Sequence, residues 1–179
     1  MTDAAESSRP PRILLLGMMG SGKSSVGRAL AARTGWPFID HDVLVERATG
    51  LSARDLLRDR GEAALRDAES AALREGLVIP APAIVAIAAG TIMRQEDRDL
   101  MRGDGLVVWL HAPPVVLAAR AAGAAHRPWL DDDPVGWFTR TVEERGPLYR
   151  SVADLEIDTG AADPAAAARR VLDRRPADG

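Results

Sequence analysis

The sequence contains no cysteine, which excludes disulfide bonds and a cysteine-based zinc site. It also lacks any apolar run near the roughly 20 residues that a membrane-spanning helix needs. Basic residues do not predominate: the net charge is -3 at pH 7, so no positive footprint for nucleic acid or an anionic membrane is expected. We therefore predict partners that are small molecules, with neither nucleic acid nor membrane among them.

The length and composition are those of one globular domain. The chain has 179 residues, of which 46% are hydrophobic, enough to bury a substantial core. Residues 1–11 are polar and acidic, unlike a signal peptide, and we predict a disordered lead-in there. The domain is predicted to span residues 12–175, and the protein to be a cytoplasmic monomer.

Short apolar runs alternate with helical patterns along the chain, and this alternation predicts an α/β fold. Continuous apolar runs are typical of buried parallel strands, and they occur at residues 13–16, 36–39, 84–88, 106–110 and, more weakly, 155–157. Helical patterns occur at 25–32, 43–48, 53–60, 63–74, 95–101, 114–121 and 135–149, and a last helix follows Asp163 and Pro164. We predict three α/β/α layers around a five-stranded parallel sheet, with ligands at the carboxyl ends of the strands.

The segment GMMGSGKS at residues 17–24 matches the phosphate-binding pattern G-x-x-x-x-G-K-[ST]. It lies between the first predicted strand and the first predicted helix, as such a loop must. Glycines allow consecutive backbone N–H groups to point at one anion, and the helix dipole favours the negative charge. Lys23 is placed to reach the β- and γ-phosphates, and the hydroxyl of Ser24 to ligate Mg²⁺. The loop predicts a nucleotide site.

Two carboxylates, Asp40 and Asp42, follow the second predicted strand with one residue between them. At a strand end this spacing points both side chains the same way, toward the phosphate loop. Asp40 could hold Mg²⁺ through a water, and Asp42 could bind an acceptor hydroxyl and take its proton. The alternative is that one of them only caps the next helix. His41 points the opposite way and is expected to be structural or exposed.

Arg66 and Glu69 stand three residues apart on one predicted helical face. An intrahelical ion pair is the simpler interpretation. The other is that Arg66 binds a substrate carboxylate, because a planar guanidinium matches a carboxylate in bidentate fashion, and that Glu69 holds it in place. Residues 122–134 show no periodicity and contain Arg127, so we predict a lid there, with a solvated linker as the alternative.

Taken together these residues resemble the shikimate kinases. The likeness rests on the phosphate loop and on the blocks Phe38-Ile39-Asp40-His41-Asp42, Gly61-Glu62-Ala63-Ala64-Leu65-Arg66, Arg127-Pro128-Trp129-Leu130 and Arg145-Gly146-Pro147-Leu148-Tyr149-Arg150. The resemblance implies an NMP-kinase-like fold with a lid at about 122–134 and an acceptor-binding segment at about 40–75. It also implies ATP- and Mg²⁺-dependent phosphorylation of shikimate to shikimate 3-phosphate, within aromatic amino acid biosynthesis.

The resemblance implies a role for each matching residue. The catalytic residues would be Lys23, Asp42 and Arg127. The nucleotide would be bound by Gly17, Gly20, Ser21, Gly22, Lys23, Ser24, Ser25 and, near the adenine, Arg120. The acceptor would be bound by Asp42, Arg66, Glu69, Ala89, Gly90 and Arg145, and the magnesium ion by Ser24 and Asp40. For Arg145 the alternative is a cation that interacts with a helix C-terminus.

One departure from the family pattern lies beside the expected acceptor site. The family usually has three consecutive glycines after the third strand, whereas this chain has Ala88, Ala89 and Gly90. An alanine keeps the backbone N–H but disfavours positive φ. Two alternatives therefore stay open: a kinase for a different polyol or cyclitol acid, and a nucleotide-binding homologue without activity. A GTPase is disfavoured, because no N-K-x-D-type segment is present.

Overall fold

A computed structural model describes residues 12–122 and 133–174 of the chain. The predicted lead-in at 1–11 and most of the predicted lid, including Arg127, lie outside the described residues. Within the described part, no helix is long and apolar enough to cross a membrane.

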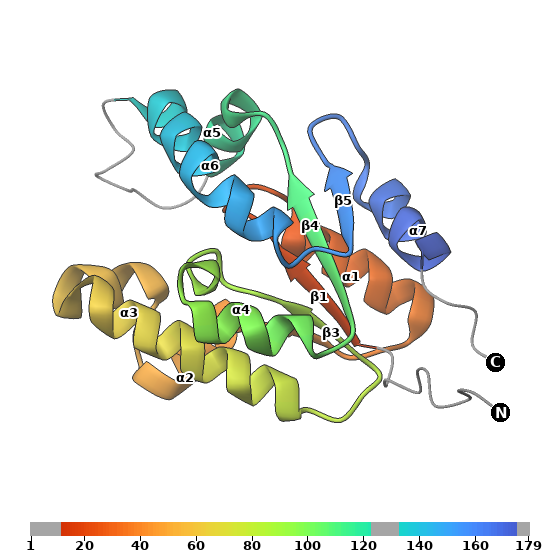
Figure 1. The fold of residues 1–179 in the computed structure, drawn as a ribbon, viewed down its shortest axis with the longest axis horizontal. Helices are drawn as coiled ribbons and strands as arrows, with labels where there is room; N and C mark the ends of the chain where they lie inside the picture. The colour runs from red at the N-terminus through yellow and green to blue at the C-terminus, as the bar shows by residue number, and fades with distance from the viewer. Residues whose placement is uncertain (1–11, 123–132, 175–179) are drawn as a thin grey trace, which may run out of the picture.

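Five parallel strands form one sheet in the order β2-β3-β1-β4-β5, which confirms the predicted fold class (Figure 1). The order places β1, from which the phosphate loop leaves, at the centre of the sheet. The strands are β1 (Arg12–Leu16), β2 (Phe38–Asp40), β3 (Ala83–Ala86), β4 (Leu106–His111) and β5 (Leu155–Asp158). All four strand pairs are parallel, so their carboxyl ends meet at one edge.

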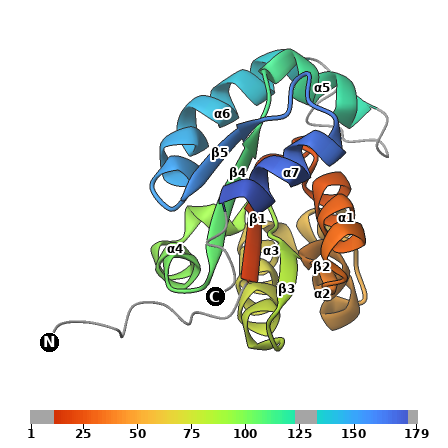
Figure 2. The ribbon, with the colours of Figure 1, turned by 90° about the vertical axis from the view of Figure 1, so that its right-hand side faces the viewer.

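Helices cover both faces of this sheet and give three layers (Figure 2). The helices are α1 (Lys23–Thr34), α2 (His41–Thr49), α3 (Ala53–Val78), α4 (Gln95–Arg102), α5 (Pro114–Ala122), α6 (Pro134–Arg150) and α7 (Pro164–Arg174), with a 3-10 turn, η1 (Thr91–Met93). α1 and α7 pack on one face, while α3, α4, α5 and α6 contribute to the core on the other.

The two cores follow from the alternation of side chains along each strand. Leu14 and Leu16 of β1 face one core with Val85, and Ile13 and Leu15 face the other. Each of these side chains is almost completely buried. A third apolar cluster joins α2 to α3, through residues that include Leu44, Val45, Leu56, Leu65 and Ala72. It fixes both helices beside the carboxyl end of β2.

Two element boundaries differ from the prediction in ways that affect the site. The helices predicted at 53–60 and 63–74 are parts of α3, and Gly61, with φ 83° and ψ 175°, interrupts the helical geometry between them. The third strand was predicted to reach residue 88, but β3 ends at Ala86 and the chain turns through 87–90 into η1. An apolar run cannot reveal this end, because residues 87–89 are apolar as well.

Candidate active site

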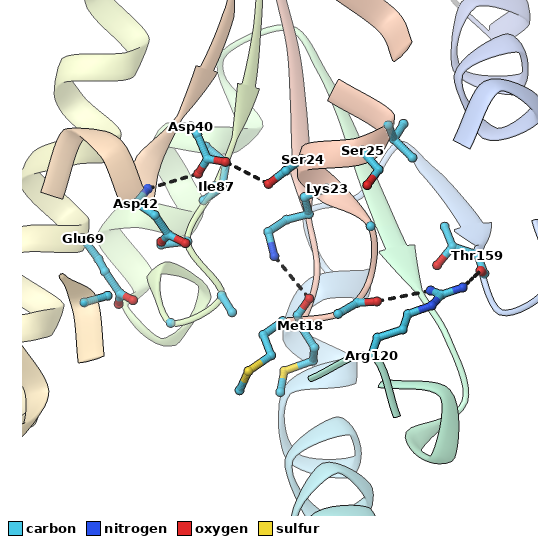
Figure 3. A pocket seen from close by; sticks show the side chains of 18 of the residues that line it. Met18, Lys23, Ser24, Ser25, Asp40, Asp42, Glu69, Ile87, Arg120 and Thr159 are labelled. Carbon is cyan, nitrogen blue, oxygen red and sulfur yellow. Dashed lines mark hydrogen bonds between the residues drawn. The ribbon is translucent and has the colours of Figure 1, made fainter. Parts of the chain in front are cut away.

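A cavity of about 650 Å³ opens at the carboxyl ends of the strands. Figure 3 shows Asp40, Asp42 and Glu69 on one side of Lys23, and Arg120 and Thr159 on the other. Most of the predicted site residues line this cavity: Gly20, Gly22, Lys23, Ser24, Ser25, Asp40, Asp42, Arg66, Glu69, Ala89, Gly90, Arg120 and Arg145. Residues predicted from separate stretches of the chain therefore come together in one place.

The phosphate loop connects β1 to α1 and depends on glycine for both its conformation and its close packing. Gly17, Gly20 and Gly22 have φ values of 141°, 78° and 92°. A Cβ on Gly17 would collide with the carbonyl oxygen of Leu110 in β4. Gly17 and Ser21 do not line the cavity, and Ser21 is completely buried. Gly17 and Ser21 therefore contribute to the conformation and packing of the loop and do not contact the cavity.

Lys23, the first residue of α1, is held against the loop that precedes it. Its Nζ donates to the carbonyl oxygen of Gly17 at 2.8 Å and to that of Met18 at 3.2 Å. Burial lowers its pKa, and the negative charges of Asp42, Asp40 and Glu69 oppose that shift. An anionic phosphate in the cavity would act in the same direction as the carboxylates and favour the ammonium form.

Asp40 ends β2 and performs two tasks. Its Oδ1 accepts the backbone N–H of Asp42 at 3.2 Å and so caps α2. Its Oδ2 accepts the hydroxyl of Ser24 at 2.8 Å. Helix capping, the alternative considered for this pair of acids, therefore applies to Asp40, whose second oxygen still reaches the predicted magnesium ligand. Asp42 is an exposed side chain in the first turn of α2, where it lines the cavity.

The oxygens of Ser24 and Asp40 suit a magnesium ion. Mg²⁺ prefers oxygen ligands and is usually held by one or two protein groups together with phosphates and water. No group of three or more histidine or acidic side chains that could hold a metal by itself occurs in the described ranges. The donor set fits an ion that arrives with a nucleotide.

To the same cavity, α3 contributes an ion pair and α6 a further arginine. Arg66 donates to Glu69 at 2.7 Å and to Glu62 at 2.9 Å. Burial raises the pKa of Glu69, even though Arg66 lies beside it. The Nε of Arg145 is buried and has no hydrogen-bond partner within the described residues. The predicted ion pair thus exists, and it stands in the cavity together with Arg145.

The segment 88–90 lies against the ion pair of α3. Gly90 has φ -84°, a value that any residue can adopt, so its backbone conformation does not require glycine. Its packing does, because a Cβ there would collide with the guanidinium of Arg66 and the carboxylate of Glu69.

Arg120 of α5 joins the phosphate loop to the segment after β5. Its guanidinium donates to the carbonyl oxygens of Gly20 at 3.2 Å and Thr159 at 2.8 Å. The hydroxyl of Thr159 in turn donates to the carbonyl oxygen of Ser21 at 2.9 Å. Arg120 also lines the cavity. Its contact with the adenine stays a prediction.

Several residues that line the cavity were not predicted. They include Met18, Met19, Arg54, Leu57, Trp137 and Thr159. Arg54 is notable because it makes no hydrogen bond or ion pair with the described residues and lies in the first turn of α3, where the helix dipole disfavours a cation. A charge placed against the dipole is a signal that could have identified it. Methionine and tryptophan have no comparable signal, because such residues usually belong to the core.

A phosphate loop at the centre of a five-stranded parallel sheet, opposite a pocket with two arginines, defines a small-molecule kinase of the P-loop class. A model of the shikimate kinase family matches residues 19–175. Shikimate kinase of Halorhodospira halophila is 39% identical over 165 residues, which cover 92% of this chain and 93% of that protein. The chain belongs to the shikimate kinase family.

Solved structures agree with this assignment. The structure of shikimate kinase from Acinetobacter baumannii in complex with shikimate superposes with a TM-score of 0.85 and 32% identity, covering 91% of each chain. Shikimate kinase from Bacteroides thetaiotaomicron gives a TM-score of 0.81 at 27% identity, covering 91% of this chain and 97% of the other. The described fold is thus that of the family over nearly its whole length.

Proposed function

We propose that this chain transfers the γ-phosphoryl group of ATP to a hydroxyl of shikimate, forming shikimate 3-phosphate and ADP. One observation carries the proposal beyond family membership. The phosphate loop, Asp42 and the two arginines Arg66 and Arg145 line the same cavity, so the donor and acceptor halves of a kinase face each other. We further propose that the enzyme acts as a monomer in the cytoplasm.

In the donor half, the chain holds phosphate by charge and by backbone N–H groups. The first turn of α1 presents unpaired N–H groups to an anion at the positive end of the helix dipole. Lys23 neutralises the β- and γ-phosphates, and Ser24 with Asp40 would hold Mg²⁺. The ion, when bound, neutralises charge that develops on the phosphoryl oxygens.

In the acceptor half, three charged side chains orient the substrate. Arg145 and Arg66 bind the shikimate carboxylate, and Glu69 keeps Arg66 in its orientation through the 2.7 Å hydrogen bond. Asp42 then accepts a hydrogen bond from the reacting hydroxyl and takes its proton as the oxygen attacks phosphorus. Phosphoryl transfer requires little covalent chemistry from the protein, so positioning and charge stabilisation supply the rate. Arg127, on the predicted lid, would stabilise the transferring group.

The direct test is a coupled assay for ADP with purified protein, ATP, Mg²⁺ and shikimate. We expect turnover that depends on all three additions. ADP formation no faster than in a reaction without acceptor would refute the proposed function. Turnover with another hydroxy acid but not with shikimate would instead support the alternative of a different polyol acid.

Gly90→Ala tests the acceptor half specifically. The added Cβ collides with the guanidinium of Arg66 and the carboxylate of Glu69, so the carboxylate-binding geometry is lost. Because the ion pair between these two side chains is largely buried, Tm should fall as well. We expect the KM for shikimate to rise at least about tenfold, the effect of losing about 1.4 kcal/mol of binding. The KM for ATP should stay within about twofold. Steady-state kinetics with each substrate varied measures both constants.

Gly103→Ala is the matched control, because it makes the same change at a glycine that does not line the cavity. Gly103 follows α4 with φ -84°, and a Cβ there would come no closer than 3.5 Å to the carbonyl oxygen of Leu100. We expect the KM for shikimate to stay at the wild-type value and stability to rise by at most about 1 kcal/mol, from the less flexible unfolded chain. If Gly90→Ala and Gly103→Ala gave the same KM for shikimate, Arg66 would not be the residue that binds the carboxylate.

A further inference from the structure

His41 is a completely buried histidine beside the acceptor pocket, at the start of α2 between the two site acids Asp40 and Asp42. The expectation that it points away from the phosphate loop left open whether it is structural or exposed, and the structure excludes exposure. Its Nδ1 accepts the backbone N–H of Ala88 at 3.3 Å. A side chain from α2 thus binds the backbone of the segment 88–90.

The hydrogen bonds of that segment can be followed group by group. The carbonyl oxygen of Ala88 accepts the N–H of Thr91 at 3.2 Å, and that of Gly90 accepts the N–H of Met93 at 3.0 Å. The carbonyl oxygen of Ala89 accepts the hydroxyl of Tyr149 at 2.8 Å. The N–H groups of Ala89 and Gly90 find no acceptor among residues 12–122 and 133–174.

His41 thus determines which N–H groups of the segment stay free. Of the three N–H groups in the segment, the imidazole occupies one, and the two that stay free belong to residues that line the cavity. Buried N–H groups are rarely left without a partner, so free ones in a binding cavity are available to a ligand oxygen. Without His41, the N–H of Ala88 would need another acceptor, and the peptide planes of the segment could rotate to find one.

The fold makes room for the imidazole at α3. A Cβ on Gly76 would lie 3.2 Å from Nε2 of His41 and 3.2 Å from Val85. Glycine inside a helix is unfavourable compared with alanine. At position 76 it allows α3 to pack directly over the ring, so that the ring is enclosed by α3, β3 and the segment 88–90.

A role in filling the core does not explain this arrangement. The Nε2 of His41 is buried and has no partner within the described residues, and a buried polar atom without a hydrogen bond is destabilising. An apolar side chain would occupy the same volume without that cost. Because Nδ1 accepts the N–H of Ala88, the ring carries its proton on Nε2.

We propose that His41 is a positioning residue for the acceptor: it holds the Ala88 N–H, and thereby orients the N–H groups of Ala89 and Gly90 toward bound shikimate. Tyr149 of α6 holds the same segment through the carbonyl oxygen of Ala89. The acceptor named here rests on the proposed function, whereas the hydrogen bond between His41 and Ala88 does not depend on it.

His41→Leu and His41→Asn separate the hydrogen bond from the volume of the ring. Leucine fills the site but has no acceptor, while the Oδ1 of asparagine can take the position of Nδ1. We expect His41→Leu to raise the KM for shikimate about tenfold and the KM for ATP less than about twofold. His41→Asn should restore the KM for shikimate to within about threefold of the wild-type value. Steady-state kinetics and thermal unfolding are measured for both variants.

Ile157→Val provides a control for lost stability. Ile157 is fully buried in the core on the α1 and α7 face, away from the segment 88–90. The Ile157→Val substitution should lower Tm without changing the KM for shikimate. Equal KM values for His41→Leu and His41→Asn, or a parallel rise in the KM for ATP, would overturn the positioning role.

Gly76→Ala tests the same contact without altering His41. The new Cβ presses on Nε2, so we expect a higher KM for shikimate in the wild-type background. The rise should be smaller in His41→Asn, whose side chain lacks the outer ring atoms, because only the contact with Val85 then remains. Amide hydrogen exchange gives a reading that needs no turnover: the Ala88 N–H should exchange faster in His41→Leu than in the wild type. Unchanged exchange at Ala88 would refute the role of His41 in holding this N–H, even if shikimate were not the acceptor.

Discussion

Replacing Lys23 with methionine is expected to lower kcat by at least a factor of roughly 10²–10³, the usual effect of removing one preorganised charge-stabilising donor. Lys23 is the only lysine in the chain, so no second ammonium group can take its place. The variant should keep its fold and its melting temperature. Burial lowers the pKa of Lys23, which means that the charged form is destabilised in the folded protein, and methionine removes that charge.

Arg28→Met is the matched control for this experiment. Arg28 is an exposed cation on the same helix, α1, and does not line the cavity. The Arg28→Met variant should keep kcat within about twofold of the wild-type value.

The single lysine allows a second measurement. An amine-reactive reagent can modify only Lys23 and the N-terminal amine, and ATP should protect Lys23. A Lys23→Met variant with more than a third of the wild-type kcat would contradict the assignment.

Asp42→Asn is expected to lower kcat by a factor of roughly 10²–10⁴, the range for removing a positioned general base. Asparagine keeps the size and can still contact the acceptor hydroxyl, but it cannot take a proton. The KM for shikimate should therefore change much less than kcat. Because Asp42 is an exposed side chain whose backbone N–H, not its carboxylate, takes part in the α2 cap, the variant should unfold at nearly the wild-type temperature.

Two comparisons make the result specific. Glu143→Gln removes an exposed carboxylate from α6 outside the cavity and should leave kcat unchanged. Asp40→Asn should act differently from Asp42→Asn, because Asp40 accepts the Ser24 hydroxyl and caps α2. We expect it to raise the Mg²⁺ concentration needed for half-maximal rate and to lower stability. Identical profiles for Asp40→Asn and Asp42→Asn would refute their separate roles.

Local patterns were sufficient to predict where the loop of residues 17–24 lies. Its pattern is contiguous, and the strand and helix that flank it are neighbouring elements in the chain. The ion pair of Arg66 and Glu69 was predictable for the same reason: helical periodicity alone puts residues three apart on one face. The burial of His41, in contrast, depends on α3 and β3, which no local pattern describes.

The sequence by itself determined the fold class, the position of the loop between β1 and α1 and the residue types predicted for the acceptor pocket, because each of these is recorded in short-range periodicity or in a contiguous motif. Only the tertiary structure decided which constraint acts on each residue of segment 88–90. Gly90 is required by the side chains of Arg66 and Glu69, and Ala88 is held by His41, 47 residues earlier in the chain. These contacts join α2, α3 and the turn after β3, and their partners are specified by packing between elements that are distant in the chain.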